Sequence, residues 1–501
     1  MALPLGVAAL VGLITIDGSF VYDDVSAIRE SPVVQGTVPW TEAFSRDFWG
    51  GPVGPQGVSW RPVAPLIWRA LWTLGGGSPW PFRVASLLFH VAATGAAFAL
   101  FRRGLDLRTA TVGALLFALH PAHAEVIGGI VSHADLLAFA LGATSLTLVL
   151  GPNANARRVV IAALLLAFGG AAKETAFLFG PLAALALLAD RSVPRRTALG
   201  RAAPLVAVAI AIVAIQLMLP RQAPTVYDNL AVATGGLTRL AHTLYTVAKG
   251  AAVCFVPTGI APNHGYAAVD LDPATLWPVA ASGVLLTLLG VGLLGWSAFT
   301  GRWRLAAALG LLIGTLALQC NLLFYSPSDL AERLLYPATA AACALVAAGL
   351  GQVANRRQSV ALVLAISLVF AAGTVTAQRP WHDELALWEH AAEVEPKAWR
   401  SQRALGAVLR KRGDTHEGGW HWMLMSFIQW SFPNPVDFGP VAALEQLPVH
   451  ERLLEGPGQL LPSDPCGLAA LWTREMYTPE ERPVTWAIFR QRYGCGDLPS
   501  R

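Results

Sequence analysis

The 501-residue chain has few charged residues: Asp, Glu, Lys and Arg make up 14% of it, whereas soluble globular domains carry roughly 25%. Hydrophobic residues make up 54% of the chain. This composition argues against a soluble globular protein and indicates a membrane protein. The net charge of +4 is small for this length, and the sequence has no glycine-rich loop for the phosphates of a soluble nucleotide. Nucleic acid is not an expected partner.

Cysteine is also scarce, with five residues and no Cys-x-x-Cys pair, so the cysteine count gives no indication of a metal site. Three of the five lie in apolar runs, where a thiol behaves as a small hydrophobic side chain: Cys254, Cys320 and Cys343. Cys466 and Cys495 lie in the polar tail, and they can form a disulfide if that tail is outside the cytoplasm. The N-terminal run 2–16 has no basic region and no clear cleavage site, so we interpret it as a first transmembrane helix.

Long apolar runs recur along the first 378 residues. Together they predict about eleven membrane spans, near residues 2–16, 81–101, 109–120, 132–150, 158–171, 175–189, 202–219, 274–299, 304–324, 332–353 and 358–377. The expected fold class is therefore an all-α polytopic membrane protein. The stretch 237–256 is apolar but contains Arg239, His242 and Lys249. It is either a re-entrant or interfacial helix or a twelfth span, and we favour the first.

Basic residues concentrate in five alternate short loops. The positive-inside rule places these loops in the cytoplasm: Arg102, Arg103 and Arg108; Arg157 and Arg158; Arg191, Arg195, Arg196 and Arg201; Arg302 and Arg304; and Arg356 and Arg357. The remaining connections then face outward, namely 17–80, 120–131, 220–273, 325–331 and everything after about residue 378.

This topology divides the chain into three parts. Residues 1–378 form a transmembrane domain, and 17–80 is its first extracytoplasmic loop. Segment 379–414 resembles part of a tetratricopeptide repeat, because Pro396 would close one repeat and the next positions match a following helix: Leu405, Gly406, Leu409 and Gly413. Residues 415–501 lose that period and form an extracytoplasmic tail of unassigned fold.

Charged and polar side chains near a bilayer are costly, so each one is a candidate for function. Five clusters fall on the predicted outward face: Tyr22, Asp23 and Asp24; Arg61; His120, His123 and Glu125 with His133 and Asp135; Lys173 and Glu174; and Glu332 and Arg333. Residues that merely snorkel to the surface would be shared between both faces. This convergence predicts a single extracytoplasmic active site.

The acidic and histidine clusters each allow several interpretations. Asp23 and Asp24 can supply a general base or hold a divalent cation, or they can cap a helix that begins at Val25. The two histidines near Glu125 can bind a metal or a phosphate, or they can hold a turn by hydrogen bonds. They do not have the i, i+4 spacing of a helical zinc site. Whether the protein needs a metal stays open.

The cationic clusters indicate phosphate binding. A guanidinium matches the geometry of a phosphate, so Arg61 and Arg333 are candidate ligands, although an interfacial arginine can also simply snorkel. Glu332 is electrostatically favourable near a helix N-terminus. The adjacent Lys173 and Glu174 can act in the site or merely neutralise each other.

A set of motifs occurs in a fixed order along the chain: Phe20-Val21-Tyr22-Asp23-Asp24, Asp47-Phe48-Trp49-Gly50, Arg61-Pro62, Leu116-Phe117-Ala118-Leu119-His120-Pro121-Ala122-His123-Ala124-Glu125, Ala134-Asp135-Leu136-Leu137, Lys173-Glu174 and Glu332-Arg333-Leu334-Leu335-Tyr336. This ordered set, over about residues 18–410, resembles the transmembrane and tetratricopeptide-repeat O-mannosyltransferase family of the GT-C class.

The resemblance implies a multi-span glycosyltransferase whose donor is a polyprenyl-phosphate-linked sugar, in eukaryotic members typically dolichyl-phosphate mannose. It implies that Asp23 and Asp24 are the catalytic feature and that repeats on the same side engage a protein acceptor. Two departures from the family pattern are present. The chain carries barely one repeat where members carry many, and His133 stands where relatives often have an arginine. The composition suggests a high-GC bacterium, which favours an inner-membrane location and an undecaprenyl- or other polyprenyl-phosphate donor.

We therefore predict transfer of mannose or another hexose, with inversion, to an acceptor hydroxyl, with Asp23 or Asp24 as the base. The groups predicted to bind the donor phosphate or substrate are Arg61, His120, His123, Glu125, His133, Asp135, Lys173, Glu174, Glu332 and Arg333. No cofactor is implied beyond an optional divalent cation. The acceptor is a protein Ser or Thr, or alternatively a lipid or glycan. A transporter or flippase of lipid-linked sugars is the rival class. It would place its site near the midplane on broken helices, for which 237–256 is the candidate.

Overall fold

The computed structural model describes residues 1–51, 59–220, 229–262, 273–322, 330–353, 355–395 and 398–414, with single residues at 269, 325, 328, 418, 421, 486, 490, 496 and 497. Over these ranges the chain is helical and has no strand. The α-helices are α1 (Ala2–Gly12), α2 (Pro32–Gln35), α3 (Val63–Gly75), α4 (Trp80–Gly104), α5 (Leu107–Ala118), α6 (Ala124–Gly128), α7 (His133–Val149), α8 (Ala156–Ala172), α9 (Phe179–Ala189), α10 (Arg195–Met218), α11 (Gly236–Phe255), α12 (Pro273–Phe299), α13 (Trp303–Gln319), α14 (Tyr336–Leu350), α15 (Arg356–Gln378), α16 (Glu384–Val394) and α17 (Trp399–Lys411).

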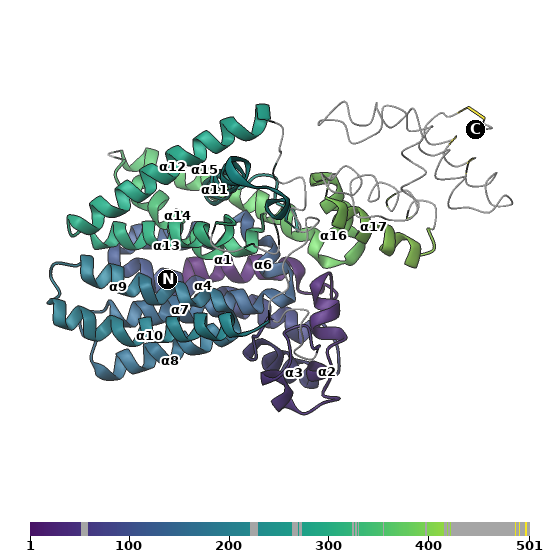
Figure 1. The fold of residues 1–501 in the computed structure, drawn as a ribbon, viewed down its shortest axis with the longest axis horizontal. Helices are drawn as coiled ribbons and strands as arrows, with labels where there is room; N and C mark the ends of the chain where they lie inside the picture. The colour runs from purple at the N-terminus through teal and green to yellow at the C-terminus, as the bar shows by residue number, and fades with distance from the viewer. Residues whose placement is uncertain are drawn as a thin grey trace.

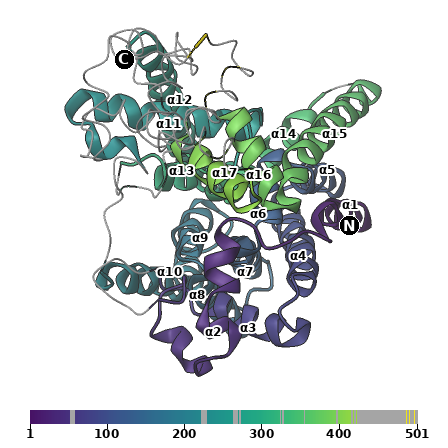
Figure 2. The same cartoon turned by 90° about the vertical axis from the view of Figure 1, so that its right-hand side faces the viewer.

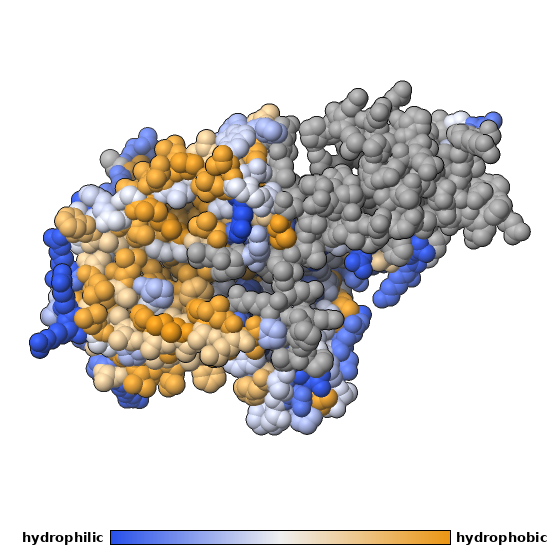
Figure 3. Space-filling view, viewed as in Figure 1, coloured by the Kyte–Doolittle hydropathy of each residue, from blue (hydrophilic) through white to orange (hydrophobic). Residues whose placement is uncertain are grey.

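The long helices lie side by side in one bundle, and α2, α3, α16 and α17 gather at one end of it (Figures 1 and 2). Within the described ranges, six helical segments have the length and composition of a membrane span: Trp80–Gly104, Ile130–Val149, Arg195–Met218, Pro273–Phe299, Glu332–Leu350 and Arg356–His382. The number becomes seven if the bent pair Leu107–Ala118 and Pro121–Gly128 is counted as one span. Apolar residues cover the side of the bundle seen in Figure 3. The chain is an integral membrane protein.

Each of the eleven predicted apolar segments contains a helix, but several of these helices are short. At 1.5 Å per residue, α1, α5 and α9 are roughly 16–18 Å long, whereas the hydrocarbon core is about 30 Å thick. Three shorter apolar helices accompany the six candidates: Ala2–Thr15, Glu174–Ala189 and Trp303–Gln319. Length and composition therefore support six or seven spans, and the number eleven is not confirmed.

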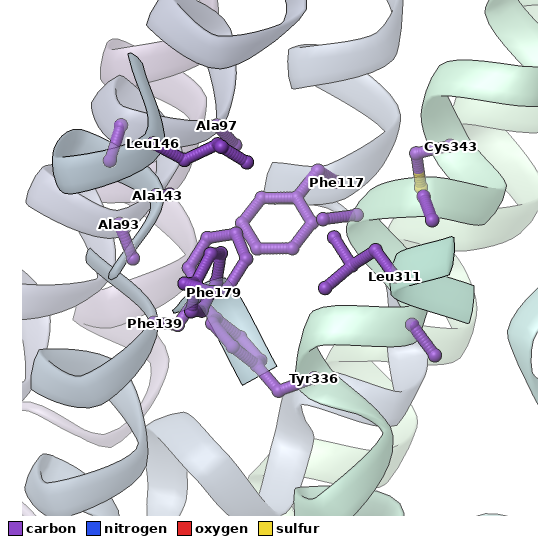
Figure 4. Packing of buried hydrophobic residues seen from close by; sticks show 14 of the residues in the cluster. Ala93, Ala97, Phe117, Phe139, Ala143, Leu146, Phe179, Leu311, Tyr336 and Cys343 are labelled. Carbon is purple, nitrogen blue, oxygen red and sulfur yellow. The ribbon is translucent and has the colours of Figure 1, made fainter. Parts of the chain in front are cut away.

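Four aromatic rings meet at the centre of the bundle (Figure 4). Phe139 lies 5.3 Å from Phe117 and 5.2 Å from Tyr336 between ring centroids, and Phe179 lies 6.1 Å from Phe139. Small residues let these helices approach closely, as is usual in membranes. At Gly142, for example, a Cβ would be 2.2 Å from the Phe179 ring.

The five basic loops meet at the end of the bundle opposite to α2 and α3. Gly351 of the last loop lies beside Thr109 of the first, and Arg304 packs over Gly104. The other contacts between these loops and the neighbouring helix ends are hydrogen bonds from Arg103 Nε to the Thr147 carbonyl (3.0 Å), from Arg201 Nη1 to the Gly151 carbonyl (3.3 Å) and from Arg191 Nη2 to the Phe299 carbonyl. The loops thus share one side of the protein, as the topology argument requires.

The structure defines the stretch 237–256 and shows where an apolar helix is broken. The stretch 237–256 coincides with the continuous helix α11, which packs along α12 and is not among the span candidates. The break in an apolar helix lies instead between Ala118 and Pro121, where the two parts meet at 53°; proline cannot continue the preceding helix.

Helices α16 and α17 pack on each other where a partial tetratricopeptide repeat is predicted. They also contact the first loop, since the Tyr22 ring lies edge-on against Trp388 with centroids 4.9 Å apart. The repeat assignment is not confirmed. Pro396, Cys466 and Cys495, like most of 415–501, lie outside the described residues.

Candidate active site

The predicted acidic pair lies in a tight turn between α1 and α2. Tyr22 has a φ of +53°, a left-handed conformation that a bulky non-glycine residue rarely adopts. A single π-helical turn, Val25–Arg29, follows directly, and such turns are frequent at functional sites. Because this backbone reverses direction sharply, the two neighbouring carboxylates point to different surroundings.

Asp24 points into the protein. It is fully buried, and its carboxylate accepts hydrogen bonds from the backbone N–H of Val131 (2.9 Å) and of Val21 (3.3 Å). It makes no side-chain cap for the turn that begins at Val25, so the capping interpretation is wrong. Burial raises the pKa of Asp24 to about 6, although nearby Arg83 and the backbone donors act to lower it. Asp24 fixes the turn and joins it to the start of the segment Ile130–Val149.

Asp23 points the other way and lines a cavity of about 550 Å³. Its side chain is 18% exposed, and it accepts a hydrogen bond from Arg333 Nη1 at 3.3 Å. Burial raises the pKa of Asp23 above its ordinary value, and Arg333 opposes that rise. Asp23 is therefore the member of the pair that a bound substrate could reach.

Three cations on the wall of this cavity are each held by carboxylates. Arg61 makes two hydrogen bonds to Glu174, at 2.9 and 2.8 Å. Lys173 Nζ lies 2.5 Å from Asp135 Oδ1, with both side chains almost fully buried. The third is Arg333, which bridges Asp23 and Glu125 Oε1, the latter at 3.0 Å.

Helix ends place these carboxylates. Glu125 lies in the first turn of α6 and Asp135 in the first turn of α7, and Glu174 begins the 3-10 turn Glu174–Leu178. An acidic side chain is stabilised in a first turn by the unpaired N–H groups there. Lys173 ends α8 in an extended conformation, and α8 packs closely along α7. All five predicted clusters, separated in the sequence, thus contribute at least one residue to one cavity.

Charged and apolar residues both line the cavity. The charged residues include Asp23, Arg61, Lys173 and Arg333. Many of the apolar residues come from α10, α13 and the turn before α9: Phe177, Leu178, Ile212, Val213, Leu217 and Leu318. A molecule with a charged group and a hydrocarbon chain matches this lining.

The three predicted histidines do not line the cavity. His120 Nε2 lies 3.1 Å from the Cys254 carbonyl, and His123 Nε2 lies 2.7 Å from Thr339 Oγ1. His133 accepts from Trp68 Nε1 at 3.2 Å and contacts the Ser86 hydroxyl at 2.7 Å. All three are fully buried, and these contacts join distant segments of the chain.

Glu332 also lies apart from the cavity. It is buried, and its Oε1 accepts from the Ala261 N–H at 3.4 Å. Its neighbour Arg333 is the member of that pair on the cavity wall.

Several polar residues of the cavity were not predicted as site residues, and Asp47 and Gln216 are two of them. Asp47 lies on the wall in the first loop, where its carboxylate accepts from the Trp49 N–H at 2.5 Å. Gln216 projects from α10 and donates to the Trp60 carbonyl at 3.3 Å. A signal for Gln216 was present, because it is an amide within the otherwise apolar run 202–219.

Metal binding receives no structural support in the part of the chain that the structure describes. That part has no group of three or more His, Cys, Asp or Glu side chains placed to hold an ion. Four carboxylates at the cavity, Asp23, Glu125, Asp135 and Glu174, are paired with cations.

Comparison with known proteins gives matches to protein O-mannosyltransferases. Residues 56–219 match the family model described as dolichyl-phosphate-mannose-protein mannosyltransferase. Protein O-mannosyl-transferase Tmtc2 of Drosophila melanogaster is 41% identical over 128 residues, which is 25% of this chain and 14% of the fly protein. TMTC2 of Mus musculus is 36% identical over 24% of this chain and 15% of its own length.

A longer match covers most of the chain. A protein O-mannosyl-transferase of Caenorhabditis elegans is 27% identical over 421 residues, which is 80% of this chain and 58% of the nematode protein. The chain thus spans little more than half the length of this relative, and its match covers far less of the other two. These comparisons confirm the resemblance to the transmembrane and tetratricopeptide-repeat O-mannosyltransferases.

Proposed function

We propose that this chain, similar to protein O-mannosyltransferases over much of its length, is a membrane glycosyltransferase. It moves mannose or another hexose from a polyprenyl phosphate to an acceptor hydroxyl. The proposal is carried by one observation: Asp23 lines the same cavity as Arg61, Lys173 and Arg333, and apolar residues of α10 and α13 line it too. A base, phosphate-binding cations and a surface for a lipid chain are the parts that this transfer requires.

Asp23 is the proposed base. Its carboxylate removes the proton of the acceptor hydroxyl while the hydroxyl oxygen attacks the anomeric carbon from the face opposite the phosphate. The bond between that carbon and the phosphate oxygen breaks, and its electron pair leaves with the lipid phosphate, so the configuration inverts. A carboxylate with a raised pKa is a stronger base than an exposed one.

The cations stabilise the negative charge that grows on the leaving phosphate. A guanidinium has five N–H donors, and Glu174 accepts two hydrogen bonds from Arg61, so Arg61 retains donors for phosphate oxygens. Lys173 adds a point charge beside it. The apolar residues of α10 and α13 would receive the first isoprene units of the donor.

The other predicted residues take supporting roles in this proposal. Asp24 holds the turn that presents Asp23, and Glu125, Asp135 and Glu174 orient the three cations. The buried histidines and Glu332 maintain the helix contacts behind the cavity and do not contact the donor phosphate.

The wider assignments follow from the same proposal. Residues 1–378 form a GT-C-like domain of about eleven spans, in which the bilayer is locally thinned around the short helices. The first loop and the C-terminal helices face the extracytoplasmic side, and the basic loops face the cytoplasm. A bacterial inner membrane and a protein Ser or Thr acceptor remain our preferred location and acceptor. The helix pair of 379–414 contacts Tyr22, and this contact would bring an acceptor bound on the pair close to Asp23.

The test compares three Asp→Asn variants in the same loop. Membranes carrying Asp23→Asn, Asp24→Asn or Asp17→Asn are supplied with a polyprenyl-phosphate sugar, and release of the lipid phosphate and labelling of acceptors are measured. Asp17 is exposed, so its variant is the matched control. Loss of a general base lowers the rate by about 10²–10⁴, and we expect this for Asp23→Asn without loss of protein. Full activity of Asp23→Asn would refute the assignment of the base.

A transporter of lipid-linked sugar is the second candidate, favoured by the bent pair Leu107–Ala118 and Pro121–Gly128. Broken helices are typical of transporter sites. A transporter moves the donor intact, so lipid phosphate would not be released in proportion to acceptor. Mass spectrometry of envelope proteins and lipids, from cells with and without the chain, would identify what gains a hexose.

A further inference from the structure

A second cavity lies at the opposite end of the bundle, among the basic loops. Its volume is about 250 Å³, and none of the described residues lines both this cavity and the candidate active site. Its wall is formed by the last turns of α4 and α7, the start of α13 and the end of α14, and by Leu182 of α9. Leu100, Phe101, Leu146 and Ala344 are representative of this wall, which is almost wholly apolar.

Arg304 is the only charged residue that the structure places on this wall. Its side chain crosses Gly104 so closely that a Cβ there would lie 3.3 Å from Arg304 Cγ. The stem therefore packs over the end of α4, while the residue as a whole is exposed. A basic head group at the mouth of an apolar cavity is the arrangement that an amphipathic anion fits.

Nearby carboxylates do not neutralise this arginine in the part of the chain that the structure describes. Asp106 accepts from the N–H groups of Arg108 and Thr109 at the start of α5, and Asp190 accepts from Ser192. Neither forms an ion pair with Arg304. Arg304 thus forms no ion pair with a carboxylate of the described residues, and its charge is available at the mouth.

Tryptophans near the mouth of the cavity indicate that it lies at the membrane–water interface. Trp303 lines the cavity, and Arg302 stacks on the Trp296 ring at 4.1 Å. Tryptophan is enriched at membrane–water interfaces, where lipid head groups lie. An apolar void at this depth loses dispersion contacts unless an acyl chain fills it.

We propose that this cavity binds an acyl chain of an anionic phospholipid whose phosphate lies on Arg304. The apolar wall selects the chain. The guanidinium lies over the Trp303 ring at 5.7 Å and keeps its charge, so it selects an anionic head group over a zwitterionic one. This site is separate from the transfer reaction, and its occupant is a structural lipid of the leaflet that faces the basic loops.

Native mass spectrometry of the purified full chain tests the proposal, with phosphatidylglycerol and phosphatidylcholine of identical acyl chains as probes. We expect tighter retention of phosphatidylglycerol. Arg304→Gln should reduce that preference about fivefold, the change expected for losing one basic residue near a lipid surface. Ala344→Phe should reduce binding of both lipids because it fills the cavity. Arg357→Gln, at the same end but outside the cavity wall, is the matched control and should retain the wild-type preference.

Three outcomes would overturn the proposal. The first is equal retention of the two lipids by the unaltered chain. The second is an unchanged preference in Arg304→Gln, which alters an exposed side chain and so does not depend on the folding of Ala344→Phe. The third is co-purification of a polyprenyl phosphate that Ala344→Phe displaces, which would make the cavity part of the donor's path.

Discussion

The buried guanidinium of Arg83 should be among the most important single side chains for stability. Arg83 is 1% exposed and lies near the start of α4. It donates to four carbonyls from three distant segments: Gly18 at 3.3 Å, Ser19, Gly128, and Trp381 at 3.3 Å. It therefore joins the first loop, the end of α6 and the end of the last long helix.

Arg83→Met removes all four hydrogen bonds and leaves the nearby buried carboxylate of Asp24 without its cation. Removing one member of a buried charged arrangement costs about 3–5 kcal/mol. Arg102→Met, at the far end of the same helix, removes one exposed hydrogen bond to Leu105 and should cost within about 0.5 kcal/mol. Arg83→Lys keeps the charge but cannot reach all three segments, so it should fall between the two.

Thermal unfolding of the detergent-purified chain, followed by loss of the monodisperse peak in size-exclusion chromatography, gives the midpoints. The order expected is Arg102→Met nearest the unaltered chain, then Arg83→Lys, then Arg83→Met. Equal midpoints for Arg83→Met and Arg102→Met would refute the view that Arg83 holds the three segments together.

Three further predictions concern the surroundings of the cavity. Trp388→Ala removes the ring that packs on Tyr22, so the left-handed backbone at Tyr22 should relax. The rate of sugar transfer should then fall with little change in donor affinity, which means a lower kcat and a similar KM. Asp24 has a pKa of about 6 in the folded chain, above its ordinary value, so the folded state binds the proton more tightly and the contribution of Asp24 to stability is lost as pH rises from about 4 through 6. That contribution is at most about 3 kcal/mol, and the unfolding midpoint of Asp24→Asn should therefore depend less on pH across this interval; an identical pH profile would contradict the reasoning. Lys173→Met leaves buried Asp135 unpaired and should lower the stability of the fold by about 3–5 kcal/mol. Adding Asp135→Asn should restore much of the stability but not the transfer activity. A double variant as unstable as Lys173→Met would show that the unpaired Asp135 is not the cause of the loss.

The charged residues of the site could be predicted because a bilayer makes charge expensive wherever it occurs. Arg61, Lys173 and Arg333 stood out in an apolar sequence for that reason, and the structure brings them to one cavity. Which of the adjacent Asp23 and Asp24 faces that cavity could not be predicted, because a backbone reversal at Tyr22 decides it and nothing in the local pattern requires a left-handed tyrosine.

The roles of the histidines could not be predicted from the sequence. A histidine is equally suited to bind a ligand or to join helices, and the sequence does not say which partner it meets. His123 meets Thr339 and His120 meets the carbonyl of Cys254, both far along the chain. Such long-range pairing depends on how the helices pack.

Span number was difficult for a different reason. Hydropathy locates each helix well, but it does not set its length. Caps such as Asp106 on α5 and Asn155 on α8 begin helices at points that the apolar runs do not specify. The apolar runs thus predict where the helices lie. The number of helices that cross the bilayer also depends on where each helix ends and how far it tilts.

The contact between Arg333 and Asp23 has a consequence for biosynthesis. The two residues are 310 positions apart, and at about 5–20 residues per second the ribosome needs roughly 15 to 60 s to pass from one to the other. During that interval Asp23 has been synthesised but Arg333 has not. Arg83 is likewise synthesised 298 positions before its partner Trp381. The contacts of the first loop are therefore completed only after residue 381 has been made. If Asp23 acts as we propose, a nascent chain would become active only after the last long helix has inserted.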